Sequence, residues 1–218
     1  MEVFREVNEF LEKVDATSLP GRFKVWCCQF GIVPRILWPL TVYEVAITRV
    51  QRMEQRMNFF WRKWLGIPRM LTSTSFFQRT GVLQLPFRSL VEDFKCRKVG
   101  LAMMMRESED AVISRMQPDV RTGRKWEAEK ATEEAIASAQ FREIQGITPA
   151  SRQGIGCSRL RTRFWSKESA MGRRELVKLE VQASEEHARW VTAAQQSQQG
   201  AWTSWEGVEP RKLSWDGL

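Results

Sequence analysis

Apolar residues recur at helical spacing through most of the chain, and this pattern predicts a series of helices. The clearest segment is 47–65, where steps of three and four residues place the apolar residues on one helical face. These residues are Val50, Met53, Met57, Phe60 and Trp64. Gly66 and Pro68 follow directly and predict that the helix ends there.

Two segments precede this helix. Residues 1–15 predict a short, acidic amphipathic helix with Val3, Val7, Phe10 and Val14 inward, ended by the turn Leu19-Pro20-Gly21. Residues 22–46 are apolar and basic, and Pro34 and Pro39 are expected to kink or split that helix. Its expected core face comprises Phe23, Trp26, Phe30, Val33, Leu37 and Leu40.

A further helix is predicted from about Phe87 to Arg106. Its expected inward residues are Phe87, Leu90, Phe94, Leu101 and Met105. Its basic residues are expected to point mostly outward: Arg88, Lys95, Arg97 and Lys98. Of these, Arg88, Lys95 and Lys98 are candidate nucleic-acid contacts.

The second half of the chain is more polar. It predicts a connector over 107–119, an Ala-rich helix over 126–143, a loop over 144–166 and a long charged helix over 168–199. A thin apolar stripe on that last helix fits a docked or coiled partner: Leu176, Leu179, Ala183, Trp190 and Ala194. The fold is therefore predicted to be all-α, with an N-terminal helix and turn (1–21), a basic helical bundle (22–106) and a helical linker (107–218).

Basic residues form a second ridge on segment 47–65, about 100° around the helix from the apolar one. They are Arg49, Arg52, Arg56 and Lys63. Cations one helical turn apart can follow a phosphate backbone and release its counterions. The alternative is a solvated face beside a core stripe.

The charge of the chain is concentrated near this ridge. The 218 residues carry a net charge of +8. Residues 22–106 hold 15 basic and 4 acidic residues, a net charge of +11, and the rest of the chain has 19 − 22 = −3. Such an excess favours a polyanionic partner, with a solvated surface as the alternative.

Tryptophans and one basic cluster add two further expectations. Arg121, Arg124, Lys125 and Trp126 precede the Ala-rich helix and could bind phosphate and stack on a base; the alternative is a capped helix start with a buried Trp. Four tryptophans at helical core spacing are expected in the core: Trp26, Trp38, Trp61 and Trp64. Trp202, Trp205 and Trp215 are expected to anchor the C-terminal tail.

The sequence argues against an autonomous enzyme. Cys27, Cys28, Cys96 and Cys157 lack zinc-site spacing and are expected to be reduced, small apolar residues, so no metal and no cofactor is predicted. The single histidine, His187, lies in a charged helical stretch, and no Gly-rich phosphate loop is present. The longest apolar run, around 36–45, is too short to span a membrane, so no membrane association is expected.

Several segments, in the same order, resemble the region after the palm in reverse transcriptases of non-long-terminal-repeat retrotransposons that carry a restriction-like endonuclease. They are LPGRFKVWCCQFGIVPRILWPLTVYEV, FFWRKWLGIPR, GVLQLPFRSLVEDFKCRKVGLAMMMRES, TGRKW, RQGIG and GAWTSWEGVEPRKLSW. The resemblance runs from about residue 19 to 218. It implies a helical thumb that grips a template-primer duplex, followed by a linker. It also implies that Arg49, Arg52, Arg56 and Lys63 contact the duplex backbone.

The same resemblance implies what this chain lacks. The family's palm aspartates, zinc knuckle and endonuclease have no counterpart here, so no catalytic residue is assigned and a fragment or degenerate element copy is expected. The predicted function is binding of RNA or an RNA/DNA duplex; the alternatives are a helical interaction protein, with a partner on 168–199, or an inert remnant. An intracellular location is expected, and the nucleus is implied by the resemblance alone.

Overall fold

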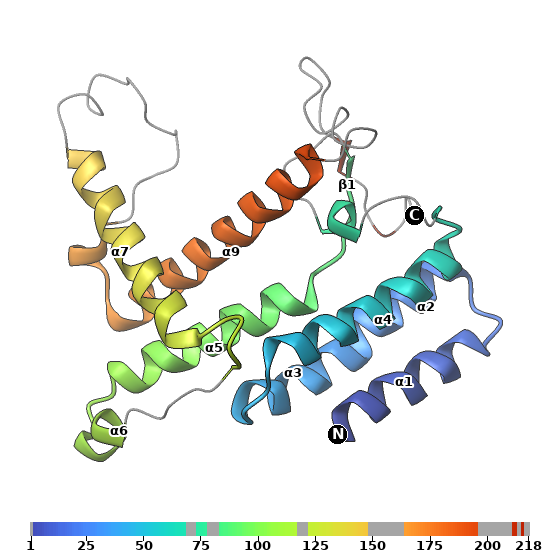
Figure 1. Cartoon of the computed structure of the whole chain (residues 1–218), viewed down its shortest axis with the longest axis horizontal. Coiled ribbons are helices and arrows are strands. Elements are labelled where there is room, and N and C mark those ends of the chain that lie inside the picture. Colours follow the sequence, from blue (N-terminus) through green and yellow to red (C-terminus); the bar gives the residue numbers. More distant parts are fainter. Residues whose placement is uncertain are drawn as a thin grey trace. The chain divides into compact units, whose positions relative to one another are not determined.

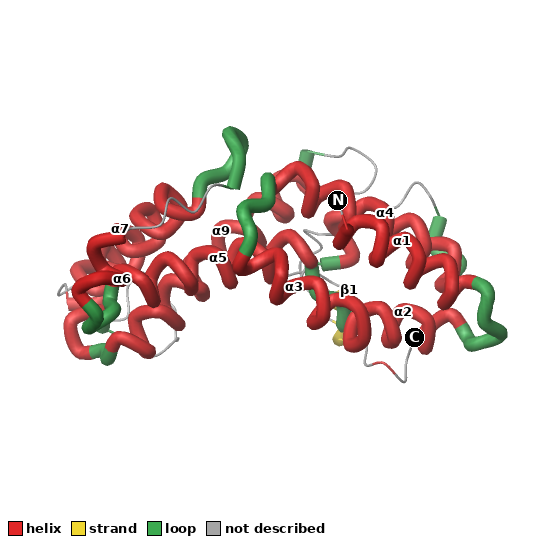
Figure 2. The backbone as a smooth tube through the Cα atoms, turned by 90° about the horizontal axis from the view of Figure 1, so that it is seen from below, coloured by secondary structure: helices red, strands yellow, loops and turns green. Residues whose placement is uncertain are grey.

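The structure is a computed structural model, and it describes residues 2–68, 73–77, 83–116, 122–147, 164–195, 211–212 and 215. The structure is 79% helical, which confirms the predicted all-α class (Figures 1 and 2). The extended structure among the described residues is one parallel pairing of β1 (Leu83–Gln84) with β2 (Arg211–Lys212).

The chain divides into two compact units, Met1–Phe94 with Ser184–Leu218, and Lys95–Ala183. These limits differ from the predicted ranges 1–21, 22–106 and 107–218. The N-terminal helix belongs to the first unit, where it contacts the helices that follow it.

The first unit contains α1 (Glu2–Asp15), α2 (Gly21–Cys27), the π-helical turn η1 (Cys28–Ile32), α3 (Val33–Val42) and α4 (Ile47–Leu65). The helices predicted over 1–15 and 47–65 are thereby confirmed. Gly66 ends α4 in the left-handed conformation, at φ 65°, which suits a residue without a Cβ. Apolar residues from α1, α3 and α4 are fully buried in this unit, among them Leu11, Ile36 and Val50.

The segment 22–46, predicted to be kinked or split, is one continuous helical stretch from Gly21 to Val42, and its last four residues are not helical. Its irregularity is η1, which comes directly before Val33-Pro34, where proline has no N–H to continue the α-helical pairing. A π-helical turn adds one residue, so the face before it is rotated by about 100° relative to the face after it.

This rotation explains an error in the predicted core face. Val33, Leu37 and Leu40, after the turn, are buried as predicted. Before the turn, Val25 is buried, whereas the predicted core residues Phe23 and Trp26 are exposed. Phe30, within the turn, is exposed as well.

The helical stretch Gly21–Val42 is long and apolar enough to cross a membrane by length and composition. It is 22 residues long, with a mean hydropathy of 1.3, and 44% of its apolar window is buried inside the structure. Its elements contact α1 and α4, and a core helix packed against its neighbours can have the same length and composition. The expectation that no segment spans a membrane was based on the shorter apolar run 36–45 alone.

Helix α5 (Leu90–Arg106) starts three residues later than predicted because Ser89 caps it. The Ser89 hydroxyl accepts a hydrogen bond from the Glu92 N–H (3.2 Å) and donates one to Glu54 Oε2 (2.6 Å). The same carboxylate oxygen accepts the Val91 N–H at 3.0 Å. Burial raises the pKa of Glu54, so this contact links α4 to the start of α5 through a carboxyl group held largely away from water.

The second unit contains the rest of α5, α6 (Ala111–Met116), α7 (Ala128–Ile147), η3 (Trp165–Lys167) and most of α9 (Ala170–Ala194). Its core residues come from α5, α7 and α9: Cys96, Val99, Met103, Ala135, Val177 and Val181. The predicted connector 107–119 therefore contains a helix, and α7 extends beyond 143. Of the predicted loop, residues 148–163 lie outside the described part.

The long C-terminal helix is confirmed as α9. The apolar stripe predicted on it for a docked or coiled partner is distinct from its buried apolar residues. Val177, Val181 and Ala193 are the buried apolar residues of α9, while Leu179 and Trp190 are exposed. The first unit of the chain also holds a buried ion pair between Arg189 of α9 and Glu92 of α5.

Candidate nucleic-acid interface

The basic ridge of α4 lies beside the acidic helix α1, and the two helices run in the same direction (Figure 1). Arg56 Nε donates a hydrogen bond to Asn8 Oδ1 at 3.1 Å, and Lys63 Nζ donates one to Asp15 Oδ2 at 2.6 Å. Both pairs are separated by 48 positions in the sequence. The helices therefore keep one register along this part of their length.

The C-terminal half of the ridge is held by contacts within the protein. Arg56 also pairs with Glu12 Oε1 at 3.7 Å, and its guanidinium lies 4.9 Å from the centroid of the Phe60 ring. Asp15 accepts a second hydrogen bond, from Trp64 Nε1 at 2.8 Å. The hydrogen bonds from Lys63 and Trp64 lower the pKa of Asp15, which keeps this carboxylate charged.

The N-terminal half of the ridge is different. In the two hydrogen-bonded pairs that set the register of α4 and α1, the residue numbers differ by 48. The same difference places Arg52 beside Phe4 (52 − 48 = 4), whose side chain has no carboxylate. Arg49 and Arg52 are exposed, and neither has a hydrogen-bond or ion-pair partner among the side chains that the structure describes. The register thus leaves these two cations available to a ligand.

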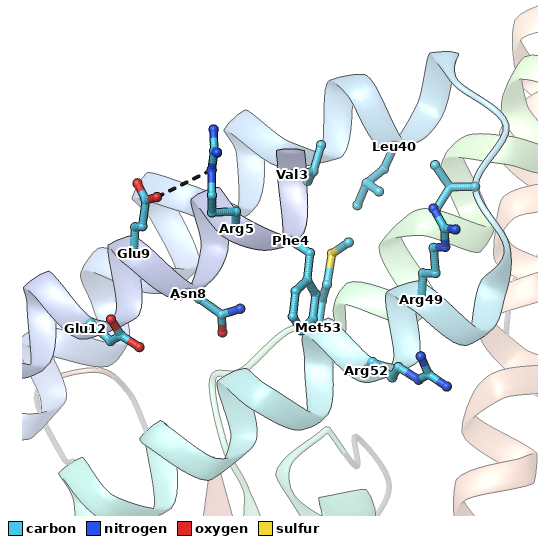
Figure 3. Close-up of a pocket in the computed structure, with 11 residues that line it drawn as sticks. Val3, Phe4, Arg5, Asn8, Glu9, Glu12, Leu40, Arg49, Arg52 and Met53 are labelled. Carbon is cyan, nitrogen blue, oxygen red and sulfur yellow. Dashed lines mark ion pairs between the residues drawn. The ribbon is translucent and has the colours of Figure 1, made fainter. Parts of the chain in front are cut away.

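A cavity of about 590 Å³ lies beside these two arginines, within the first unit (Figure 3). Arg49 and Arg52 line one end, and residues of α1, including Asn8, Glu9 and Glu12, line the other. Apolar side chains also line the cavity: Val3, Phe4, Leu40, Val45 and Met53. Sequence periodicity could not predict this cavity, because it depends on how α1 meets α4.

The basic residues predicted on α5 and just before it have separate environments. Arg88 is exposed, and Gln29 holds its backbone: Gln29 Nε2 donates to the Arg88 carbonyl (3.2 Å), and the Arg88 N–H donates to Gln29 Oε1 (2.9 Å). Lys95 lies 5.5 Å from the centroid of the Trp126 ring. Lys98 is 1% exposed, so its predicted outward orientation is wrong; it shares the buried side of α5 with Phe94 and Val99.

The cluster before α7 has the features of a capped helix start. Thr122 is buried; its hydroxyl donates to the Trp126 carbonyl (2.7 Å) and accepts the Ala128 N–H (3.2 Å). Trp126 is half-buried against the core of the second unit, and Arg124 and Lys125 are exposed. Arg121 lies outside the described residues.

The tryptophans predicted in the core divide into two pairs. Trp61 is buried and Trp64 half-buried, as predicted. Trp26 is 48% and Trp38 65% exposed, so their assignment to the core is wrong. Trp26 lies on the face that η1 rotates outward, and Trp38 lies beside the buried Leu37 on the outer side of α3.

One tryptophan of the tail is described, and it contacts the first unit. The Trp215 ring is 5.8 Å from that of Phe30 and 5.7 Å from that of Phe87, measured between centroids. This agrees with the expectation that it anchors the tail. Trp202 and Trp205 lie outside the described residues.

The described titratable residues offer little nucleophilic or metal chemistry. Burial raises the pKa of the Cys28 thiol to about 12, so this thiol stays protonated at neutral pH. Cys96 is buried as well, and His187 is exposed, with its ring 6.3 Å from that of Trp190. Within the described residues, no group of three or more His, Cys, Asp or Glu side chains is placed to hold a metal ion.

Comparisons with protein-family models, with curated proteins and with solved structures found no match for this chain.

Proposed function

We propose that the first unit binds the backbone of an RNA or RNA/DNA duplex, independently of sequence, through Arg49 and Arg52. The observation that carries this proposal is that both guanidinium groups are exposed, one helical turn apart, and without a partner among the described side chains. Arginine presents five N–H donors in a planar arrangement that suits phosphate oxygens. Two such groups at this spacing can contact phosphates along one strand.

The charge of the surrounding chain supports the same partner. Residues 22–106 carry a net charge of +11, whereas α1 holds five acidic and two basic residues. Because α1 engages Arg56 and Lys63, Arg49 and Arg52 are the two cations of the ridge whose charge no described carboxylate neutralises.

The resemblance to the thumb region of retrotransposon reverse transcriptases adds a specific ligand, the template-primer duplex. On this proposal the chain is a non-catalytic piece of such an enzyme that binds the duplex and does no chemistry of its own. Arg49 and Arg52 are its principal contacts, and Arg56 and Lys63 serve mainly to hold α1.

The test is a fluorescence-anisotropy titration with a blunt RNA/DNA duplex, repeated at several salt concentrations. Arg49→Gln/Arg52→Gln is compared with Lys13→Gln/Lys130→Gln, which removes the same charge at two exposed lysines away from α4. We expect the arginine variant to lower the slope of log K against log salt by about 1.5, because each lost phosphate contact removes about 0.7–0.9. Equal behaviour of the two variants would overturn the assignment.

A second candidate function is protein interaction, and a separate observation favours it. Phe23, Trp26, Phe30 and Trp38 are exposed along α2, η1 and α3, where large apolar residues mark interaction surfaces. Sedimentation velocity of the full chain over a range of concentrations distinguishes the two. A mass that rises with concentration, and falls back in Trp26→Gln/Trp38→Gln, would support self-association through this face.

A further inference from the structure

We infer that the cavity between α1 and α4 binds one unpaired nucleotide with an amino-bearing base, its phosphate lying on Arg49 and Arg52. This inference rests on the proposed binding of nucleic acid and extends it. It predicts that a duplex with an unpaired end is a better ligand than a blunt one. The argument follows the three zones of the cavity in turn (Figure 3).

The first zone binds an anion. Arg49 and Arg52 extend from one face of α4 at the end of the cavity, and both are exposed without a described partner. A phosphate placed there exchanges water for charge-assisted hydrogen bonds from two guanidinium groups. No carboxylate among the described side chains competes for them.

The second zone is apolar and contains an aromatic ring. Phe4 is 39% exposed, although the neighbouring Leu40 and Met53 are buried. In Figure 3 the Phe4 ring lies beside Met53, between the arginines and the polar residues of α1. A nucleobase placed here covers an aromatic face, a contact that every base can make.

The third zone favours a base that carries an amino group. Glu9 and Glu12 supply carboxylate acceptors; Glu9 also pairs with Arg5 (3.5 Å) and Glu12 with Arg56 (3.7 Å). The Asn8 oxygen accepts from Arg56, so the amide nitrogen of Asn8 is left as a donor. Adenine and cytosine present an amino donor next to a ring acceptor, and that pair complements a carboxylate and an amide donor.

The size and charge of the cavity restrict the ligand further. A volume of about 590 Å³ lies in the usual range for small-molecule sites, roughly 300–1,000 Å³, and is suited to a nucleotide rather than a duplex. The carboxylates of Glu9 and Glu12 disfavour a ligand with a second anionic group at that end. Because the cavity has room for a nucleotide but not for a duplex, the bound nucleotide lies outside the base-paired stack.

The experiment compares three ligands by anisotropy and competition: a blunt RNA/DNA duplex, the same duplex with one unpaired terminal adenosine, and free AMP. We expect the unpaired adenosine to strengthen binding by about five- to tenfold, at the lower end of what stacking on an aromatic side chain contributes. Phe4→Ala should remove this gain and leave the affinity for the blunt duplex unchanged. Phe4→Tyr should restore it.

A matched control is Phe141→Ala, which removes an exposed phenylalanine ring from α7, a helix of the second unit. Thermal unfolding followed by circular dichroism establishes that each variant is folded. Free AMP that competes in a Phe4-dependent way would identify the mononucleotide itself as a ligand. A gain seen only with the duplex would identify the nucleic-acid end as its source.

Two failures are distinguishable. Absence of blunt-duplex binding at low salt would overturn the proposed function, and free AMP would then test the cavity alone. Binding of the blunt duplex with no gain from the unpaired adenosine, or a gain that Phe4→Ala leaves intact, would overturn the nucleotide site only.

Discussion

The two halves of the basic ridge on α4 have the same sequence pattern and different environments. Arg49 and Arg52 are exposed beside a cavity, whereas Arg56 and Lys63 are bound by Asn8, Glu12 and Asp15 of α1. Helical periodicity places all four on one face, but it does not say what that face meets. The difference shows that a basic ridge is a candidate binding surface only where no acidic helix neutralises it.

The largest expected effect comes from Gly21, where α2 begins against the end of α4. A Cβ at this position would lie 1.8 Å from the carbonyl oxygen of Trp64, which is backbone and has little freedom to move. Gly21→Ala should therefore destabilise the protein by about 3 kcal/mol, at the upper end of the cost of overpacking. It should also loosen the contacts of Asp15 with Lys63 and Trp64.

Chemical denaturation measures this change, and Gly31→Ala is the control. A Cβ at Gly31 would meet only the Phe10 ring, at 3.6 Å, an ordinary contact distance. A loss of stability as large in Gly31→Ala would show that the close approach to Trp64 is not the cause.

The next effect separates the two halves of the ridge by their role in binding. Arg49→Glu/Arg52→Glu should weaken duplex binding by about 100-fold or more, because each charge-assisted hydrogen bond contributes about 1.5–3 kcal/mol. The melting temperature should change little, since both residues are exposed. Anisotropy and thermal unfolding measured on the same sample report the two quantities.

Arg56→Glu should not be combined with Arg49→Glu/Arg52→Glu, because the triple variant would not separate affinity from stability. That change removes the contact with Asn8 and places a carboxylate beside Glu12, so it should lower stability as well as affinity. If Arg49→Glu/Arg52→Glu also unfolds the protein, the proposed difference in role between the two halves of the ridge is wrong.

A smaller effect is expected at the C-terminal half. Lys63→Met removes the cation from Asp15 while keeping an unbranched side chain, and should destabilise the first unit by about 1 kcal/mol, as expected for a partly exposed ion pair. Duplex affinity at moderate salt should be nearly unchanged. Lys13→Met, at an exposed lysine of α1, should affect neither stability nor affinity.

The smallest effect is a pH dependence at Asp15. Its pKa in the folded protein is lowered below the ordinary value of 3.8 by hydrogen bonds from Lys63 and Trp64. The folded state therefore binds this proton less readily than the unfolded state, and the stabilisation is complete above pH 3.8. It is lost as the pH falls from there through the folded pKa.

Asp15→Asn tests this dependence, because asparagine does not titrate in that range. The free energy of unfolding, measured from pH 6 to 2.5, should fall less steeply in the variant than in the wild type. Parallel curves would contradict the role given to Asp15 in holding α1.

Local sequence determined the all-α class, the span of α4 and its end at Gly66, because these follow from helical periodicity and from the conformational freedom of one glycine. It also determined that a basic ridge exists beside the apolar one. The start of α5 was less predictable, because the Ser89 cap depends partly on Glu54 of another helix.

Tertiary structure decided the rest. The π-helical turn η1 rotates Phe23 and Trp26 outward, which a uniform helical period does not reveal. The register of α1 against α4 decided that Lys63 is paired and Arg52 is not, and it left the cavity beside Phe4. Both outcomes depend on how separate helices meet, and that is a property of packing between segments rather than of the residue pattern within one.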